Sequence, residues 1–195
     1  RTTINNWDIS SVNLAASLFY FAQSFNQDLN NWDTSNVTLF QGTFHYSNFN
    51  SDITDWDVSS GLKFTSMFML SPFNRDITNW NMSSSNDLGA MFQQNPDFNQ
   101  PIGNWDVSNV TNMYAMFHTA ETFNQPIESW DVSNVTSMQY TFLRAYAFNQ
   151  DLNDWDVGQV VNFFACFYEA TLFNKNIQSW DTSNVTNFQQ MFYNS

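Results

Sequence analysis

The stretch Trp105-Asp106-Val107-Ser108-Asn109-Val110-Thr111 decides the fold, because close copies of it recur along the whole chain. Each copy carries one of the eight tryptophans, and successive tryptophans lie 24 or 25 residues apart. A fixed period in this range is typical of stacked repeats, each of which buries its apolar face against its neighbours. We expect one array over residues 1–195, with repeats starting near Ile4, Leu29, Ile53, Ile77, Ile102, Ile127, Leu152 and Ile177.

The apolar positions of each repeat predict one strand and one helix. An aliphatic residue lies three before each Trp and a mostly β-branched residue two after it, which indicates a short strand centred on the Trp. Val110, Met113, Met116 and Phe117 are then spaced like one face of a short helix, with Ser108 as its N-cap. The predicted fold is a right-handed, leucine-rich-repeat-like α/β solenoid, with one short parallel strand and one short helix in each repeat.

Each repeat closes with a Phe-Asn pair, as in Phe98-Asn99-Gln100-Pro101. Because Asn at a turn can bond nearby backbone and stack on the same Asn of the next repeat, we expect a structural asparagine ladder. The repeats at Trp32 and Trp56 are one residue shorter just before this Phe, which places the deletion in a loop.

The composition argues against several functions. The chain has 18 acidic and 5 basic residues and a net charge of -13, which disfavours nucleic acid and anionic lipid as partners. No apolar run is long enough to cross a membrane. The single cysteine, Cys166, replaces a Met of other repeats and is expected to be a buried apolar residue. His45 and His118 are three repeats apart, and neither a catalytic triad nor a phosphate-binding glycine loop is found, so we expect no catalytic residue and no cofactor.

The consensus W-D-V-S-N-V-T-x-M-x-x-M-F-x-x-A-x-x-F-N-Q-[DP]-I occurs nearly in full twice between Trp130 and Ile177. It resembles the DUF285 repeat of bacterial surface proteins, common in mycoplasma lipoproteins and similar to BspA-like leucine-rich repeats. The resemblance covers essentially all 195 residues, and departs most at Gly61 and Ser85, where other repeats have Val. It implies an extracellular or cell-surface, adhesin-like protein without established catalytic residues.

An aspartate follows nearly every Trp and would form a column of like charges. The column consists of Asp8, Asp33, Asp57, Asp106, Asp131, Asp156 and Asp181, with Asn81 at the one gap. Each carboxylate could accept hydrogen bonds from backbone or Ser/Thr groups nearby. Two alternatives stay open, a calcium ladder between successive carboxylates and an acidic stripe that faces a ligand.

Two further sets of residues are candidate sites. A partner face is predicted on the helix, thirteen residues after the Trp, where the side chains project outward or lie half-buried between helices: Tyr20, His45, His118, Tyr168 and Tyr193. Five sequons are candidate N-glycosylation sites, although the same residues also recur as part of the repeat: Asn36, Asn81, Asn109, Asn134 and Asn184.

These observations predict a non-enzymatic extracellular structural or adhesive module. The last repeat keeps Trp180, Phe188 and Phe192 rather than a polar cap. We therefore expect either further repeats in a longer chain, or self-association of copies end to end into a filament. The alternative is a surface module that binds calcium or another ligand through its acidic face.

Overall fold

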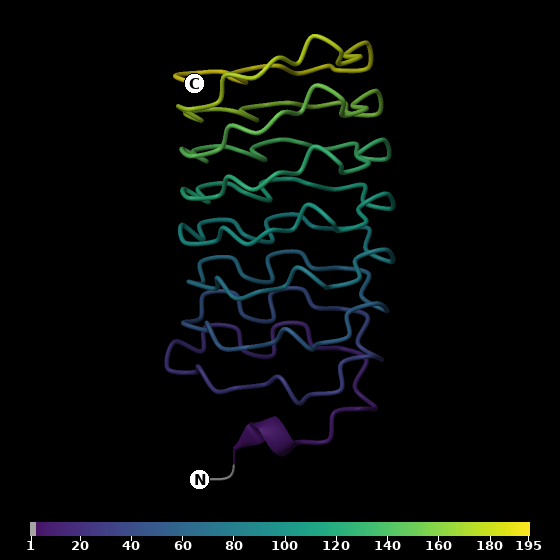
Figure 1. Cartoon of the computed structure of the whole chain (residues 1–195), viewed down its shortest axis with the longest axis vertical. Helices are drawn as coiled ribbons and strands as arrows, with labels where there is room; N and C mark the ends of the chain where they lie inside the picture. The colour runs from purple at the N-terminus through teal and green to yellow at the C-terminus, as the bar shows by residue number, and fades with distance from the viewer. Residues whose placement is uncertain (1–2) are drawn as a thin grey trace.

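The computed structural model describes residues 3–195 and arranges them as a stack of eight coils, one for each repeat (Figure 1). The two termini lie at opposite ends of the stack. We number the coils 1 to 8 along the chain, and they comprise residues 4–28, 29–52, 53–76, 77–101, 102–126, 127–151, 152–176 and 177–195.

The predicted leucine-rich-repeat-like α/β solenoid is wrong. Within residues 3–195 the only helix is the 3-10 helix η1 (Ile4–Asn6), and parallel pairing is limited to isolated bridges. The bridges join residues seven after each Trp, not the residues around it: Leu14↔Leu39, Leu39↔Lys63, Lys63↔Asp87, Asp87↔Asn112, Asn112↔Ser137, Ser137↔Asn162 and Asn162↔Asn187.

The segment around each Trp is too short to be a strand. In coil 5 one turn closes where the Trp105 N–H donates to the Ile102 carbonyl (3.1 Å), and another where the Val110 N–H donates to the Val107 carbonyl (2.8 Å). Little extended chain is left between the two turns. The predicted burial is nevertheless correct, because Trp105, Val107 and Val110 are all buried.

A chain of turns replaces the predicted helix, and its N–H groups alternate between two kinds of partner. In coil 5 the N–H groups of Met113, Ala115, Phe117 and Thr119 donate to carbonyls of coil 6 at 2.7 to 3.1 Å. The N–H groups between them close local turns, as Met116 does on the Met113 carbonyl (3.2 Å). Half of the backbone donors therefore hold neighbouring coils together, whereas a helix would use them within itself.

Backbone conformation stops the helix at two positions in every coil. The residues ten and fourteen after the Trp have positive φ, as Ala115 (53°) and Thr119 (58°) show in coil 5. Positive φ at the third residue of a turn is typical of type II turns and incompatible with an α-helix. The wrong prediction arose because apolar spacings of three, three and one fit this series of turns as well as a helix.

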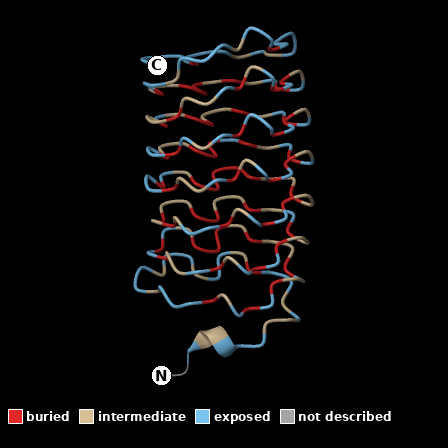
Figure 2. Cartoon of the chain, in the orientation of Figure 1, coloured by how far each residue is buried: buried red, intermediate tan, exposed pale blue. Residues whose placement is uncertain are grey.

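Stacked aromatic rings fill the interior. The ring of Phe117 lies 4.0 Å from Phe123 in its own coil and 5.6 Å from Phe142 in the next, nearly parallel to both. Figure 2 shows the buried positions along the inside of the stack, while most of the last coil is exposed. No helix in residues 3–195 has the length and apolar character needed to cross a membrane.

Two side-chain ladders run the length of the stack. Each indole Nε1 from Trp32 to Trp180 donates to the carbonyl that begins the preceding coil, at 2.7 to 3.3 Å. The predicted asparagine ladder is confirmed: from Asn26 to Asn149, each Oδ1 accepts the backbone N–H of the equivalent Asn one coil further on, at 2.8 to 3.1 Å.

The shorter coil 2 uses a serine where coils 1, 5, 6 and 7 have an extra turn. In coil 5 the Phe123 N–H closes a turn on the Ala120 carbonyl (3.1 Å). In coil 2 the Phe49 N–H instead donates to the hydroxyl of Ser47 (3.3 Å). The missing residue of coil 2 therefore falls in the turn before Phe49. The Ser47 hydroxyl accepts the hydrogen bond that a backbone carbonyl accepts in coil 5.

Candidate functional site

The aspartate column has a structural role in each coil. Every member accepts a hydrogen bond on Oδ1 from the backbone N–H two residues later, at 2.9 to 3.1 Å, and Asn81 does the same at the gap. The Ser108 hydroxyl also donates to Asp106, at 2.6 Å. The interpretation that nearby backbone and Ser groups satisfy these carboxylates is confirmed, while the prediction of Ser108 as a helix N-cap is wrong because no helix follows it.

These hydrogen bonds favour the ionised carboxylates. The Ser108 hydroxyl and backbone N–H lower the pKa of Asp106, and those of Ser133 lower the pKa of Asp131 although the neighbouring charge of Asp106 opposes this. In residues 3–195 no group of three or more His, Cys, Asp or Glu side chains is placed to hold a metal ion together. Calcium binding to the column stays a prediction.

Four of the five sequon asparagines bridge neighbouring coils. The Nδ2 groups of Asn36, Asn109, Asn134 and Asn184 each donate to a carbonyl of the preceding coil, at 2.7 to 2.8 Å. Asn81 occupies a different position, one after its Trp, and its Oδ1 accepts the Ser83 N–H. The recurrence of Asn in the other four sequons thus has a structural explanation, and glycosylation stays a prediction.

The predicted partner face lies along one edge of the stack and is only partly exposed. Tyr20 and Tyr193 are about half exposed, while His45, His118 and Tyr168 are half-buried. Burial, followed by the charge of Arg144, lowers the pKa of His118, whose Nδ1 lies 2.9 Å from Gln93 Nε2. Much of this face is therefore covered by packing between neighbouring coils. Its role in partner binding stays a prediction.

Cys166 lies fully inside the stack. Burial raises the pKa of its thiol to about 12. The prediction of a buried apolar residue in a Met position is confirmed.

The ends of the stack carry apolar surface that the middle coils bury. In coil 1 the exposed fractions are 58% for Trp7 and 50% for Leu18, and in coil 8 they are 47% for both Phe188 and Phe192. The other tryptophans are at most 9% exposed. These residues define two end faces, the N-terminal face on coil 1 and the C-terminal face on coil 8.

The end faces also carry unused backbone groups, arranged in complementary rows. At each of the seven junctions, four N–H groups of one coil donate to four carbonyls of the next. Within residues 3–195, no backbone partner is found for the corresponding N–H groups of coil 8, on Phe188, Gln190, Phe192 and Asn194. The same holds for the corresponding carbonyls of coil 1, on Leu14, Ala16, Leu18 and Tyr20.

Stacked coils joined by repeated side-chain and backbone ladders define a tandem-repeat protein. The chain belongs to the family described as "Mycoplasma protein of unknown function, DUF285", which matches residues 1–102 and again residues 86–195. The expected DUF285 membership is confirmed, while the likeness to BspA-like repeats is not confirmed by this match. No curated protein and no solved structure matches the chain.

Sequence reasoning did not find the two end faces as defined sites. The unpaired groups belong to the backbone and leave no trace in side-chain identity. The indole donors of the tryptophan ladder were missed for a similar reason, because their acceptors are backbone carbonyls. One usable signal was Ala15, which stands where every later repeat has Phe, Leu or Met.

Proposed function

We propose that the chain is a non-enzymatic structural module that self-associates end to end through its two end faces. The observation that carries the proposal is the complementarity of the free N–H row on coil 8 and the free carbonyl row on coil 1. A coil 8 placed on the coil 1 of a second copy would repeat the hydrogen-bond register of the seven internal junctions. Open backbone edges of this kind are templates for pairing with another chain.

Apolar burial favours the same arrangement. Inside the stack, Phe167 lies 5.6 Å from Phe192 and Phe163 lies 6.0 Å from Phe188. On the open side of coil 8, the rings of Phe188 and Phe192 are free to stack on a further coil. In coil 1, the open side of the Phe19 ring faces the N-terminal end of the stack. Such a heterologous contact does not close on itself and would build a filament.

The net charge of -13 and the family resemblance lead us to place this assembly at the cell surface, as a structural or adhesive element. Protease treatment of intact cells that express the full-length protein tests the location. Digestion of the repeats while cytoplasmic marker proteins stay intact is expected, and full protection would contradict the surface location.

Sedimentation velocity over a concentration series, with negative-stain imaging of the same samples, tests the end-to-end contact. We expect the parent chain to form rods that lengthen with concentration. Phe188→Asp places an unpaired charge in the contact and should leave monomers. The control is Tyr114→Asp, at an exposed side position of coil 5, which should still assemble.

Circular dichroism melting of each variant verifies that it is folded. A parent chain that stays monomeric at every concentration would overturn the end-to-end proposal. Equal loss of assembly in both variants would point to lateral association through the side of the stack instead.

A further inference from the structure

We propose that the cavity in coil 1 binds one small, neutral, single-ring aromatic molecule. The cavity lies beside Ala15, which is eight residues after Trp7. In the other seven coils a bulky side chain occupies this position: Phe40, Phe64, Leu88, Met113, Met138, Phe163 and Phe188. A methyl group at Ala15 leaves unfilled the space that a ring takes up in four of those coils.

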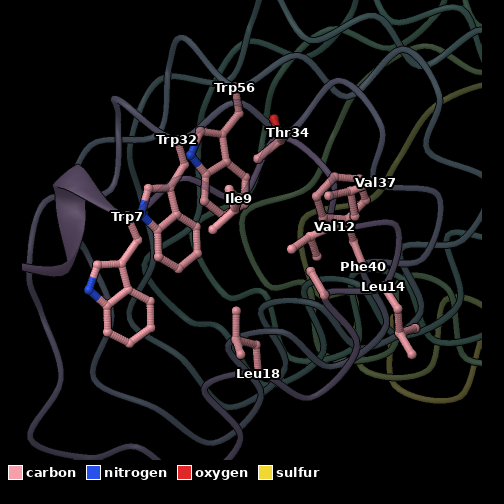
Figure 3. A pocket seen from close by; sticks show the side chains of 11 residues that line it. Trp7, Ile9, Val12, Leu14, Leu18, Trp32, Thr34, Val37, Phe40 and Trp56 are labelled. Atoms are coloured by element: carbon pink, nitrogen blue, oxygen red, sulfur yellow. The ribbon is translucent and has the colours of Figure 1, made fainter.

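The cavity has a volume of about 290 Å³ and an apolar wall. Figure 3 shows Trp7 and Trp32 on one side of it and Val12 and Phe40 on the other. Trp7 and Leu18, about half exposed, form part of its rim. The volume exceeds the roughly 150 Å³ of an enclosed apolar cavity that binds benzene in another protein.

The wall offers no group that would require a polar or charged ligand. Among the lining residues, the Thr34 hydroxyl already donates to the Asp57 carbonyl at 2.9 Å, and the indole N–H groups of Trp32 and Trp56 donate to the Ile4 and Leu29 carbonyls. The indole nitrogen of Trp7 lies on the side of its ring away from Val12 and Phe40 (Figure 3). A charged ligand would therefore lose hydration without gaining a partner, whereas a neutral apolar one would not.

The stack itself indicates that the ligand is aromatic. At the same position in coils 2 and 3, the rings of Phe40 and Phe64 lie 5.0 Å apart and within 9° of parallel. Phe40 itself is fully buried, so the aromatic surface open to a ring beside Ala15 is the indole of Trp7, which lines the cavity and is 58% exposed. Offset-stacked aromatic pairs gain free energy beyond that of area burial, so an aromatic ring should bind more tightly than an aliphatic ring of similar size.

The site lies on the N-terminal face, which the end-to-end assembly would cover, so assembly and binding would compete. Binding is therefore measured in the Phe188→Asp background, because that substitution is in coil 8, at the opposite end of the stack. Failure of one proposal then leaves the other intact.

Fluorobenzene is the probe, and its binding is followed by ¹⁹F NMR titration. We expect a saturable shift of the fluorine resonance with one site per chain, and weaker binding of cyclohexane in competition. Ala15→Phe fills the cavity and should abolish the saturable shift. The matched control is Ala16→Phe, in the neighbouring position where coil 7 already has Phe164, and it should bind as the parent does.

Ala15→Leu, which copies Leu88 of coil 4, is the second variant should Ala15→Phe fail to fold, and thermal melting establishes that each variant is folded. Absence of saturable binding in the parent would overturn the proposal. So would binding that survives in a folded Ala15→Phe or Ala15→Leu variant, because the ligand would then occupy another place.

Discussion

The indole Nε1 of Trp105 donates a hydrogen bond of 3.1 Å to the backbone carbonyl of Ile77, the first residue of the preceding coil. The same bond recurs at every junction, so the tryptophan that marks the period also fixes the register of the stack. Trp7 differs from the other tryptophans, because within residues 3–195 its indole has no hydrogen-bond partner and its side chain is 58% exposed.

Trp105→Phe should therefore destabilise the fold by about 2–4 kcal/mol, through the loss of a buried hydrogen bond and of side-chain volume. Urea unfolding followed by circular dichroism measures the change. Trp7→Phe is the matched control and should alter the free energy of unfolding by less than about 0.5 kcal/mol. Equal effects of the two substitutions would show that the indole bond does not stabilise the stack.

The asparagine ladder gives a second prediction. Asn99 Oδ1 accepts the backbone N–H of Asn124 and the side-chain Nε2 of Gln125, both at 3.0 Å. Asn99→Ala leaves these donors unpaired and should cost about 1–3 kcal/mol of unfolding free energy. Asn104→Ala, at an exposed position of the same coil, is the control and should have almost no effect. A neutral Asn99→Ala in chemical denaturation would contradict the role of the ladder.

Ser85 presents a position where the chain can be stabilised. Its hydroxyl is buried, and no hydrogen-bond partner for it is found within residues 3–195. Six other coils have Val at this position: Val12, Val37, Val110, Val135, Val160 and Val185. Ser85→Val removes the unpaired hydroxyl and adds apolar contact, which should stabilise the fold by about 1–2 kcal/mol.

Differential scanning calorimetry measures the effect of Ser85→Val as a rise in melting temperature. The control is Ser84→Val at the adjacent, half-buried position, where no such gain is expected. A lower melting temperature for Ser85→Val would mean that the space between coils 3 and 5 cannot accept the extra methyl group.

The period and the buried positions could be predicted from the sequence, but the backbone could not. Burial of Val110, Met113, Met116 and Phe117 follows from their spacing, yet that spacing suits a chain of turns as well as a helix. The deciding feature is positive φ at residues such as Ala115 and Thr119, which their side chains do not signal. Of the eight residues at the position of Ala115, one in each coil, only Gly42 is a glycine.

Some features of the candidate sites could likewise be predicted from the sequence, and others could not. The pairing of Asp106 with Ser108 could be predicted because it is local in sequence. The end faces depend on which backbone groups of coils 1 and 8 lack a neighbour, and this is a property of the stack. Ala15 could have been recognised as an exception to the repeat, but the cavity beside it required coordinates.

The hydrogen bonds of the aspartates predict how stability depends on pH. Hydroxyl and backbone N–H donors two residues later lower the pKa of Asp8, Asp52 and Asp106 below the usual value of 3.8. A carboxylate whose pKa is lower in the folded state stabilises the fold above its unfolded pKa, and this contribution is lost as the pH falls through the folded pKa. The melting temperature should therefore be steady above about pH 5 and fall progressively below about pH 4.

Ser108→Ala tests this explanation at one residue, because it removes the hydroxyl donor and keeps the backbone N–H. The pKa of Asp106, measured from its carboxyl ¹³C shift, should rise toward 3.8. Ser129→Ala is the control, since the Ser129 hydroxyl donates to the Gly103 carbonyl and not to an aspartate. An unchanged pKa of Asp106 in Ser108→Ala would show that the hydroxyl bond does not stabilise the ionised column, and the acid sensitivity would then need another source.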